Sequence, residues 1–165
     1  MFRRMPRSFD FAGMKSDLVI EEVDLKDTAV SVQWTGKRQF VGTDSGNHSV
    51  VMSSHSEDNN TGVKPSEMLL LALGACSAYD VVSILEKKRY KLTCLKVNVQ
   101  SSQDDDPPWM FRKIHVDFTV CGNNLKEKDI QQATSLSIEN YCSVAATVRC
   151  NAEITYDFHI QQVEN

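Results

Sequence analysis

The sequence lacks the patterns that identify the common classes of ligand. It has no glycine-rich phosphate loop, no dinucleotide-binding fingerprint and no nucleophile-elbow motif. It also has no basic stripe, and its net charge is −4 with a pI of about 5.5. Nucleic acid is therefore not expected as a partner, because nucleic-acid-binding domains carry a basic surface.

The cysteines lack the spacing of a disulfide framework. There are five of them in 165 residues, and no two form a CxxC pair. An odd number without short regular spacing argues against a secreted, disulfide-rich scaffold. The pattern favours a reducing compartment, in which a functional disulfide is transient.

Long hydrophobic runs are also missing. The longest, residues 68–76, is far too short to span a bilayer, so we expect no membrane partner. The N-terminus contains Arg3, Arg4 and Arg7, which resembles the beginning of an organelle-targeting peptide. It is short and poor in serine, so we favour a solvated tail over residues 1–17 and a cytoplasmic protein, with a mitochondrial or other organellar location as the alternative.

The remaining residues, 18–165, have the length of one ordinary domain and show no internal repeat or linker. A chain of this size buries roughly two-thirds of its unfolded surface, so it needs no metal or disulfide to fold. The four histidines are scattered and none lies at helical metal-binding spacing. The aspartates at 104–106 precede two prolines and are predicted to form a solvated turn. We therefore expect no metal and no cofactor.

The clearest predicted helix opens at Pro65, whose fixed φ and missing N–H suit a first helical turn. Glu67 follows, where a carboxylate favours the positive end of the helix dipole. Residues 68–76 are apolar all round, which predicts a helix that is buried on every side. The cations at 87–89 then complement the end of the helix dipole.

The rest of the chain alternates between strands and short helices. Two hairpins are predicted, the first from residues 18–23 and 28–34 and the second from residues 39–43 and 49–53. Three later segments alternate between apolar and polar residues, as antiparallel strands with one wet face do; they are residues 95–99, 114–120 and 154–160. Helical spacing over 126–141 and a short helix at 143–148 complete an α+β pattern.

The positions of the cysteines separate them into two groups. Cys94 and Cys121 share the polar parity of their strands and are predicted bystanders, and Cys150 shares the parity of the core. Cys76 ends the apolar helical run, where a buried cysteine is ordinarily an inert small hydrophobe. Cys142 begins a helical segment, a position that lowers a thiol pKa.

Asp80 lies one helical turn after Cys76 and on the same face. A carboxylate there would raise the pKa of a neighbouring thiol unless a cation paired with it. Surface solvation or an ion pair is the alternative to a role in a site.

Two motifs resemble those of the OsmC/Ohr family, the osmotically induced and organic hydroperoxide resistance proteins. One is KPSEMLLLALGACSAYDVV at residues 64–82, which is similar to the central-helix motif, and the other is ENYCSV at residues 139–144, which is similar to the second cysteine motif. The resemblance covers roughly residues 30–160 and is greatest to the branch typified by bacterial YhfA proteins.

The resemblance implies an OsmC-like fold, in which antiparallel sheets wrap around long central helices in an intertwined homodimer. It also implies a thiol-dependent peroxidase that reduces organic hydroperoxides. Cys76 would be the reactive cysteine that forms a sulfenic acid, and Cys142 would resolve it as a disulfide. An external dithiol, such as that of a lipoylated protein, would then restore both thiols.

The sequence departs from the family pattern at two supporting positions. Better-known members carry a glutamate directly after the helix-opening proline, whereas Ser66 stands here and Glu67 follows, about 100° farther round the helix. Those members also hold the thiolate with an arginine on an early strand, for which Arg38 is the candidate. The Ser66 departure supports the alternative of a non-enzymatic, redox-sensing or ligand-binding dimer.

Overall fold

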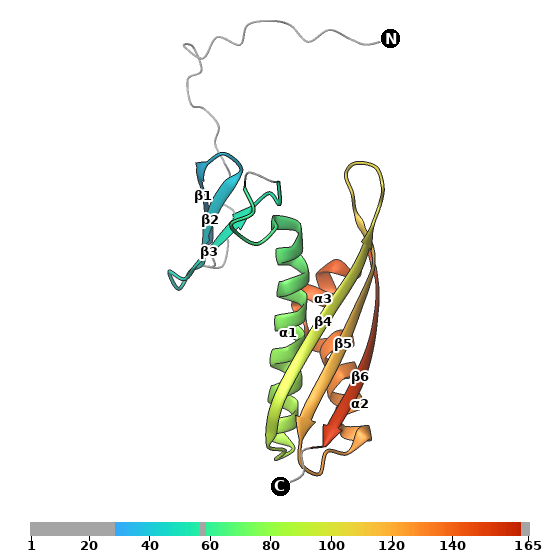
Figure 1. Cartoon of the computed structure of the whole chain (residues 1–165). Helices are drawn as coiled ribbons and strands as arrows, with labels where there is room; N and C mark the ends of the chain where they lie inside the picture. The colour runs from blue at the N-terminus through green and yellow to red at the C-terminus, as the bar shows by residue number, and fades with distance from the viewer. Residues whose placement is uncertain (1–28, 57–58, 163–165) are drawn as a thin grey trace, which may run out of the picture.

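The structure is a computed structural model, and it describes residues 29–56 and 59–162 (Figure 1). The predicted tail over 1–17 and the predicted strand at 18–23 lie outside the described residues. The elements follow in the order β1 (Ser31–Gly36), β2 (Gln39–Thr43), β3 (Ser49–Ser53), α1 (Pro65–Lys87), β4 (Leu92–Gln103), β5 (Phe111–Gly122), α2 (Glu127–Leu136), the π-helix η2 (Ser137–Tyr141), α3 (Ser143–Val148) and β6 (Glu153–Gln162). The predicted α+β class is confirmed.

Strands β1, β2 and β3 form a small antiparallel sheet beside the N-terminal end of α1 (Figure 1). The hairpin predicted between β2 and β3 is confirmed. Its turn is held by Asp44, whose Oδ1 accepts hydrogen bonds from the backbone N–H groups of Gly46 and His48, both at 2.8 Å. A short side chain that bonds to its own backbone in this way favours a turn over a continued strand.

Strands β4, β5 and β6 form the larger sheet, and one prediction about it was wrong. β4 and β5 pair antiparallel, but β5 and β6 pair parallel. The segment α2–η2–α3 lies between them and returns the chain to the starting edge, as a parallel connection requires. The apolar–polar alternation therefore predicts that one face of the sheet is covered, but it does not predict whether neighbouring strands run parallel or antiparallel.

Helices α1, α2 and α3 all lie on one face of this sheet, and the core forms between the two layers (Figure 1). Phe118 of β5 is its largest fully buried side chain. Other fully or almost fully buried residues are Leu73, Val81 and Leu85 of α1, Ile114, Val116 and Val120 of β5, and Ile130 and Ala133 of α2. The opposite face of the sheet is polar. There His159 Nε2 lies 3.3 Å from an Asp117 carboxylate oxygen.

Helix α1 begins at Pro65, as predicted, and extends for 23 residues, well past the apolar run. By length and composition alone it would be long enough to cross a membrane. The prediction that residues 68–76 are buried on every side is wrong for a single chain, because the sheet and the other helices leave one side of α1 open. Leu69 remains 37% exposed and Leu71 54% exposed.

Candidate functional site

Cys76, Asp80 and Cys142 come together where α1 meets the beginning of α3. The two sulfur atoms and a carboxylate oxygen of Asp80 all lie within 4.8 Å of one another. Cys76 and Asp80 are half-buried, and Cys142 is 2% exposed. The fold therefore places the two cysteines of the two motifs side by side, although the sequence between them includes two strands and a helix.

A π-helical turn directly before Cys142 positions this residue beside Cys76. Helix α2 widens at its end into η2, and the N–H of Cys142 donates to the Ser137 carbonyl at 2.9 Å. Cys142 then adopts an extended conformation as the N-cap of α3, where its Sγ accepts from the Ala145 N–H at 3.4 Å. Single π-helical turns of this kind occur frequently at functional sites.

The buried Ser137 hydroxyl connects η2 to α1. Its Oγ lies 3.1 Å from the Ser77 carbonyl oxygen and 3.2 Å from Asp80 Oδ2, so its one proton is shared between two acceptors. This contact fixes the Asp80 carboxylate beside the cysteines. Sequence reasoning missed Ser137; the only signal was a polar residue between Leu136 and Ile138.

The thiol of Cys142 does not have the lowered pKa expected at a helix N-terminus. Burial raises its pKa, while the Ser77 hydroxyl and the Ala145 N–H partly oppose the rise and the neighbouring Cys76 adds to it. The six-residue α3 is too short, and Cys142 too buried, for the dipole to dominate. Among the described residues, the fully buried Ser77 hydroxyl has no partner that meets ordinary hydrogen-bond geometry.

The structure does not bring Arg38 or Glu67 to the cysteine pair within one chain. Arg38 is exposed in the β1–β2 connection and lines a separate hollow with Lys37, Ser54, Ser56 and Asn59. Glu67 is exposed in the first turn of α1. It lies about 14 Å from Cys76 along the helix axis and about half a turn round it.

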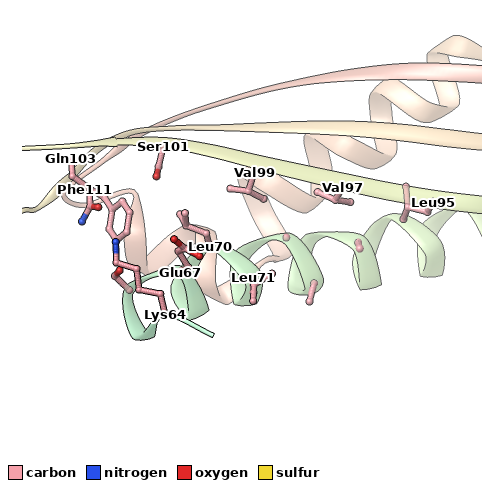
Figure 2. Close-up of a pocket in the computed structure, with 14 residues that line it drawn as sticks. Lys64, Glu67, Leu70, Leu71, Leu95, Val97, Val99, Ser101, Gln103 and Phe111 are labelled. Atoms are coloured by element: carbon pink, nitrogen blue, oxygen red, sulfur yellow. The ribbon is translucent and has the colours of Figure 1, made fainter. Parts of the chain in front are cut away.

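An apolar groove of about 570 Å³ separates α1 from β4 (Figure 2). Leu70 and Leu71 line it on the helix and Val97 and Val99 on the strand, with Glu67 and Lys64 at one end. A Cβ on Gly74 would lie only 3.1 Å from Val99 Cγ2, so glycine permits this close approach of helix and strand. Ala75 and Ala78 line the groove but Cys76 does not, so the groove follows a different face of α1 from the cysteine pair.

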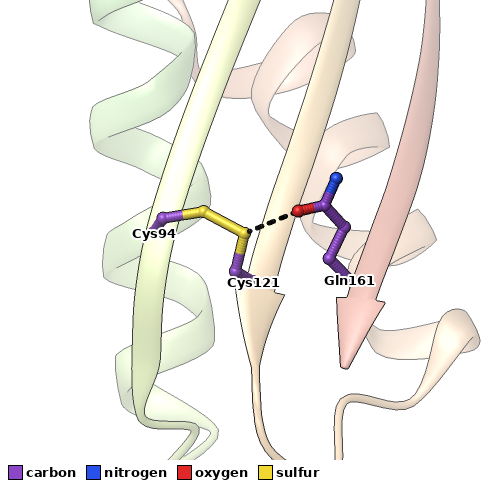
Figure 3. Close-up of a disulfide and its surroundings, with 3 residues drawn as sticks. All are labelled: Cys94, Cys121 and Gln161. Carbon is purple, nitrogen blue, oxygen red and sulfur yellow. Dashed lines mark hydrogen bonds between the residues drawn. A yellow bond between two sulfur atoms is a disulfide. The ribbon is translucent and has the colours of Figure 1, made fainter. Parts of the chain in front are cut away.

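Cys94 and Cys121 form a disulfide across β4 and β5, so the prediction that they are bystanders was wrong (Figure 3). Their parity was predicted correctly, since both lie on the side of the sheet away from the helices. The signal that the sequence analysis missed was the register in which β4 and β5 pair. A hairpin turn centred on Pro107 and Pro108 places residues 94 and 121 directly opposite each other, with their Cα atoms 4.8 Å apart.

Cys150 is exposed, so the prediction that it packs in the core was also wrong. It lies in the turn after α3, before β6 begins at Glu153. Strand parity does not extend into a turn, and its agreement with Ile154 was therefore accidental.

These features define a member of a known family of small α+β proteins. Residues 56–157 match the model of the OsmC-like proteins, and the chain belongs to this family. It is 36% identical over 129 residues to protein YhfA of Escherichia coli K12, a match that covers 78% of this chain and 95% of YhfA.

Two solved structures show the same fold. The OsmC-like protein of Mycoplasma pneumoniae superposes with a TM-score of 0.72 at 15% identity, covering 82% of this chain and 97% of that one. The organic hydroperoxide resistance protein OhrB of Bacillus subtilis gives a TM-score of 0.55 at 16% identity, covering 80% and 97%. The predicted OsmC-like fold is confirmed.

Proposed function

We propose that this protein is a thiol-dependent peroxidase that reduces organic hydroperoxides. The observation that carries the proposal is the pair of free cysteines, Cys76 and Cys142, whose sulfurs lie within 4.8 Å of each other. Membership of the OsmC-like family and the likeness in fold to an organic hydroperoxide resistance protein support it.

In the proposed reaction the Cys76 sulfur, as thiolate, attacks the hydroperoxide. An S–O bond forms and the O–O bond breaks, and the leaving alkoxide takes up a proton to become an alcohol. Cys76 is oxidised by two electrons to a sulfenic acid. The Cys142 sulfur then attacks Cys76, forming the disulfide and releasing water, and an external dithiol returns two electrons by thiol–disulfide exchange.

The different surroundings of the two cysteines support this division of roles. Cys76 is the more accessible of the two, as the residue that meets the substrate should be. Cys142 is buried with a raised pKa, which keeps it as a thiol until an electrophilic sulfur forms beside it.

We also propose that the protein is a homodimer. Large apolar side chains remain exposed on both the small sheet and the outer side of α1, including Trp34 at 64% and Tyr79 at 75%. Contiguous exposed apolar surface marks interfaces. Arg38 remains the proposed cation, with Glu67 or Asp80 as the carboxylate that orients it. Since Arg38 and Glu67 are remote from Cys76 within one chain, their roles depend on a second copy. Light scattering that gave a mass of 18.6 kDa at micromolar concentration would contradict the dimer.

A single-turnover experiment tests the peroxidase. Pre-reduced protein is mixed with a slight excess of an alkyl hydroperoxide, and peroxide loss is counted per chain. Cys142→Ser should consume about one equivalent and then stop, whereas Cys76→Ser should consume none. The exposed Cys150→Ser serves as the matched control and should match the unmodified protein. If Cys76→Ser still consumes an equivalent, the assigned nucleophile is wrong.

Turnover with different reductants tests the proposed partner. A lipoyl dithiol should sustain repeated cycles, because its second thiol completes each exchange intramolecularly. A monothiol at the same thiol concentration should sustain fewer.

The alternative function is a non-enzymatic, redox-sensing or ligand-binding dimer. The specific observation that favours it is the apolar groove between α1 and β4, which neither cysteine of the pair lines and which has the size of a small-molecule site. Failure of the unmodified protein to consume any hydroperoxide would favour this reading.

A further inference from the structure

We propose that Cys76, Cys142 and Asp80 form a binding site for a thiophilic divalent cation such as Zn²⁺. Each residue offers one ligand atom, and the three atoms lie within 4.8 Å of one another. In a tetrahedral site such atoms lie about 3.5–3.8 Å apart, given Zn–S bonds of about 2.3 Å and Zn–O bonds of about 2.0–2.2 Å. The cluster therefore needs to contract by at most about 1.3 Å at its widest pair.

Two hydroxyl groups around the cluster support a built site. Ser137 Oγ lies 3.2 Å from Asp80 Oδ2 and fixes the carboxylate, as an outer-shell partner does for a metal ligand. Ser77 is fully buried, and within the described residues its Oγ makes no hydrogen bond of ordinary geometry, although it lies close enough to Cys142 to affect the pKa of that thiol. A buried hydroxyl without a well-formed hydrogen bond is costly unless a ligand or water meets it, and this one adjoins a sulfur ligand.

The charges of the three ligands also favour a cation. Metal binding deprotonates the cysteines that it uses as ligands and releases their protons. The divalent ion then balances two of the three negative charges that two thiolates and a carboxylate carry, which offsets the cost of desolvating them in a half-buried cluster. Soft sulfur ligands select Zn²⁺ over Mg²⁺ or Ca²⁺, which prefer oxygen.

Three protein ligands leave one of the four positions of a tetrahedral ion open, as in zinc sites that also bind water or a small ligand. The half-buried Cys76 gives the outer side of the cluster access to solvent. Metal binding uses the same sulfur electron pairs that attack a peroxide. The metal-bound and disulfide forms are therefore mutually exclusive, whether or not the protein turns over peroxide.

Metal binding is measured with the pre-reduced, full-length protein, using Zn²⁺ in competition with a chromogenic chelator. We expect about one Zn²⁺ per chain at this site. Cys76→Ser and Cys142→Ser should abolish it, and Asp80→Asn should weaken it by about tenfold or more. The Asn variant keeps an acceptor for Ser137, so it tests the ligand charge with little change in folding.

Two controls separate this site from other thiols. Cys150→Ser and the double variant Cys94→Ser/Cys121→Ser should retain the same affinity. Bound Zn²⁺ should also protect Cys76 and Cys142, but not Cys150, from alkylation by iodoacetamide. This readout does not depend on peroxide chemistry, so the site can be confirmed even if the peroxidase proposal fails.

Three results would overturn the proposal. One is unchanged Zn²⁺ affinity in Cys76→Ser or Cys142→Ser variants that melt as cooperatively as the unmodified protein. The second is equal affinity after Cys76 and Cys142 have been oxidised to a disulfide, since that form has no thiolate to offer. The third is Mg²⁺ binding as tightly as Zn²⁺.

Discussion

Removing the Cys94–Cys121 disulfide should destabilise the protein substantially. The bond joins residues separated by 27 positions. For a loop of about this length the chain-entropy model gives about 3.5 kcal/mol at 25 °C. This is the upper end of the expected effect, because hairpin structure that persists in the unfolded chain reduces it. For a chain of this size, 3.5 kcal/mol corresponds to a fall in Tm of roughly 7–14 °C.

The double variant Cys94→Ser/Cys121→Ser isolates this effect because serine has nearly the size of cysteine and only Cys121 of the two is buried. Cys94 is exposed, and Gln161 Oε1 lies 3.5 Å from Cys121 Sγ, so a serine hydroxyl at 121 gains an acceptor (Figure 3). The matched control is Cys150→Ser, which removes an exposed free thiol and should leave Tm within about 1 °C.

Two measurements check the prediction. Thiol titration of the denatured protein, without reductant and with Cys76 and Cys142 reduced, should find three free thiols per chain, the third being Cys150. Thermal melts should then show that reductant lowers the Tm of the unmodified protein and leaves the double variant unchanged. Five free thiols, or equal Tm values for the two proteins under oxidising conditions, would refute the reasoning.

Two further substitutions test contacts between the helices. Asp129 accepts hydrogen bonds from Lys88 Nζ and Tyr90 OH, both at 2.7 Å, and the bond from Lys88 is the main cause of its lowered pKa. A depressed carboxyl pKa contributes stability above its unfolded pKa of about 3.9 and loses it as pH falls through the folded value. In urea unfolding at pH 7, the Asp129→Asn variant should therefore have a lower free energy of unfolding than the unmodified protein. At pH 3 the difference between the two proteins should be smaller. A difference of the same size at pH 7 and pH 3 would count against the ion pair. The Ser137→Ala substitution leaves Asp80 without its buried donor and should lower the free energy of unfolding by about 1–3 kcal/mol. The control, Ser143→Ala at an exposed position, should lower it by less than about 0.5 kcal/mol. Similar losses from the two substitutions would show that the Ser137 contact is unimportant.

Local structure could be predicted from the sequence where a single residue determines the backbone conformation. Pro65 marked the beginning of α1, and Asp44 marked the β2–β3 turn, because fixed φ and a side-chain bond to the backbone act within a few residues. Alternation identified the covered face of β5 and β6. It could not give their parallel direction, which depends on the path of the chain between them.

The candidate site was predicted through motif resemblance, and its surroundings were not. The resemblance singled out Cys76 and Cys142, and the fold places them together. The π-helical turn at Ser137 has no sequence signature, and the rise in the pKa of Cys142 follows from burial that only the packed structure shows. By contrast, the Cys94–Cys121 pairing was readable from the turn at Pro107–Pro108 but requires counting register across both strands.

The larger sheet separates the two pairs of neighbouring cysteines from each other. Cys94 and Cys121 bridge β4 and β5 on its polar side (Figure 3), whereas Cys76 and Cys142 lie among the helices on the other. A reagent in solution meets the first pair at the exposed Cys94, but it meets the second only at the half-buried Cys76, because Cys142 is buried. One small domain can therefore hold a bonded pair and a reduced pair at the same time, because a layer of backbone and packed side chains prevents exchange between them.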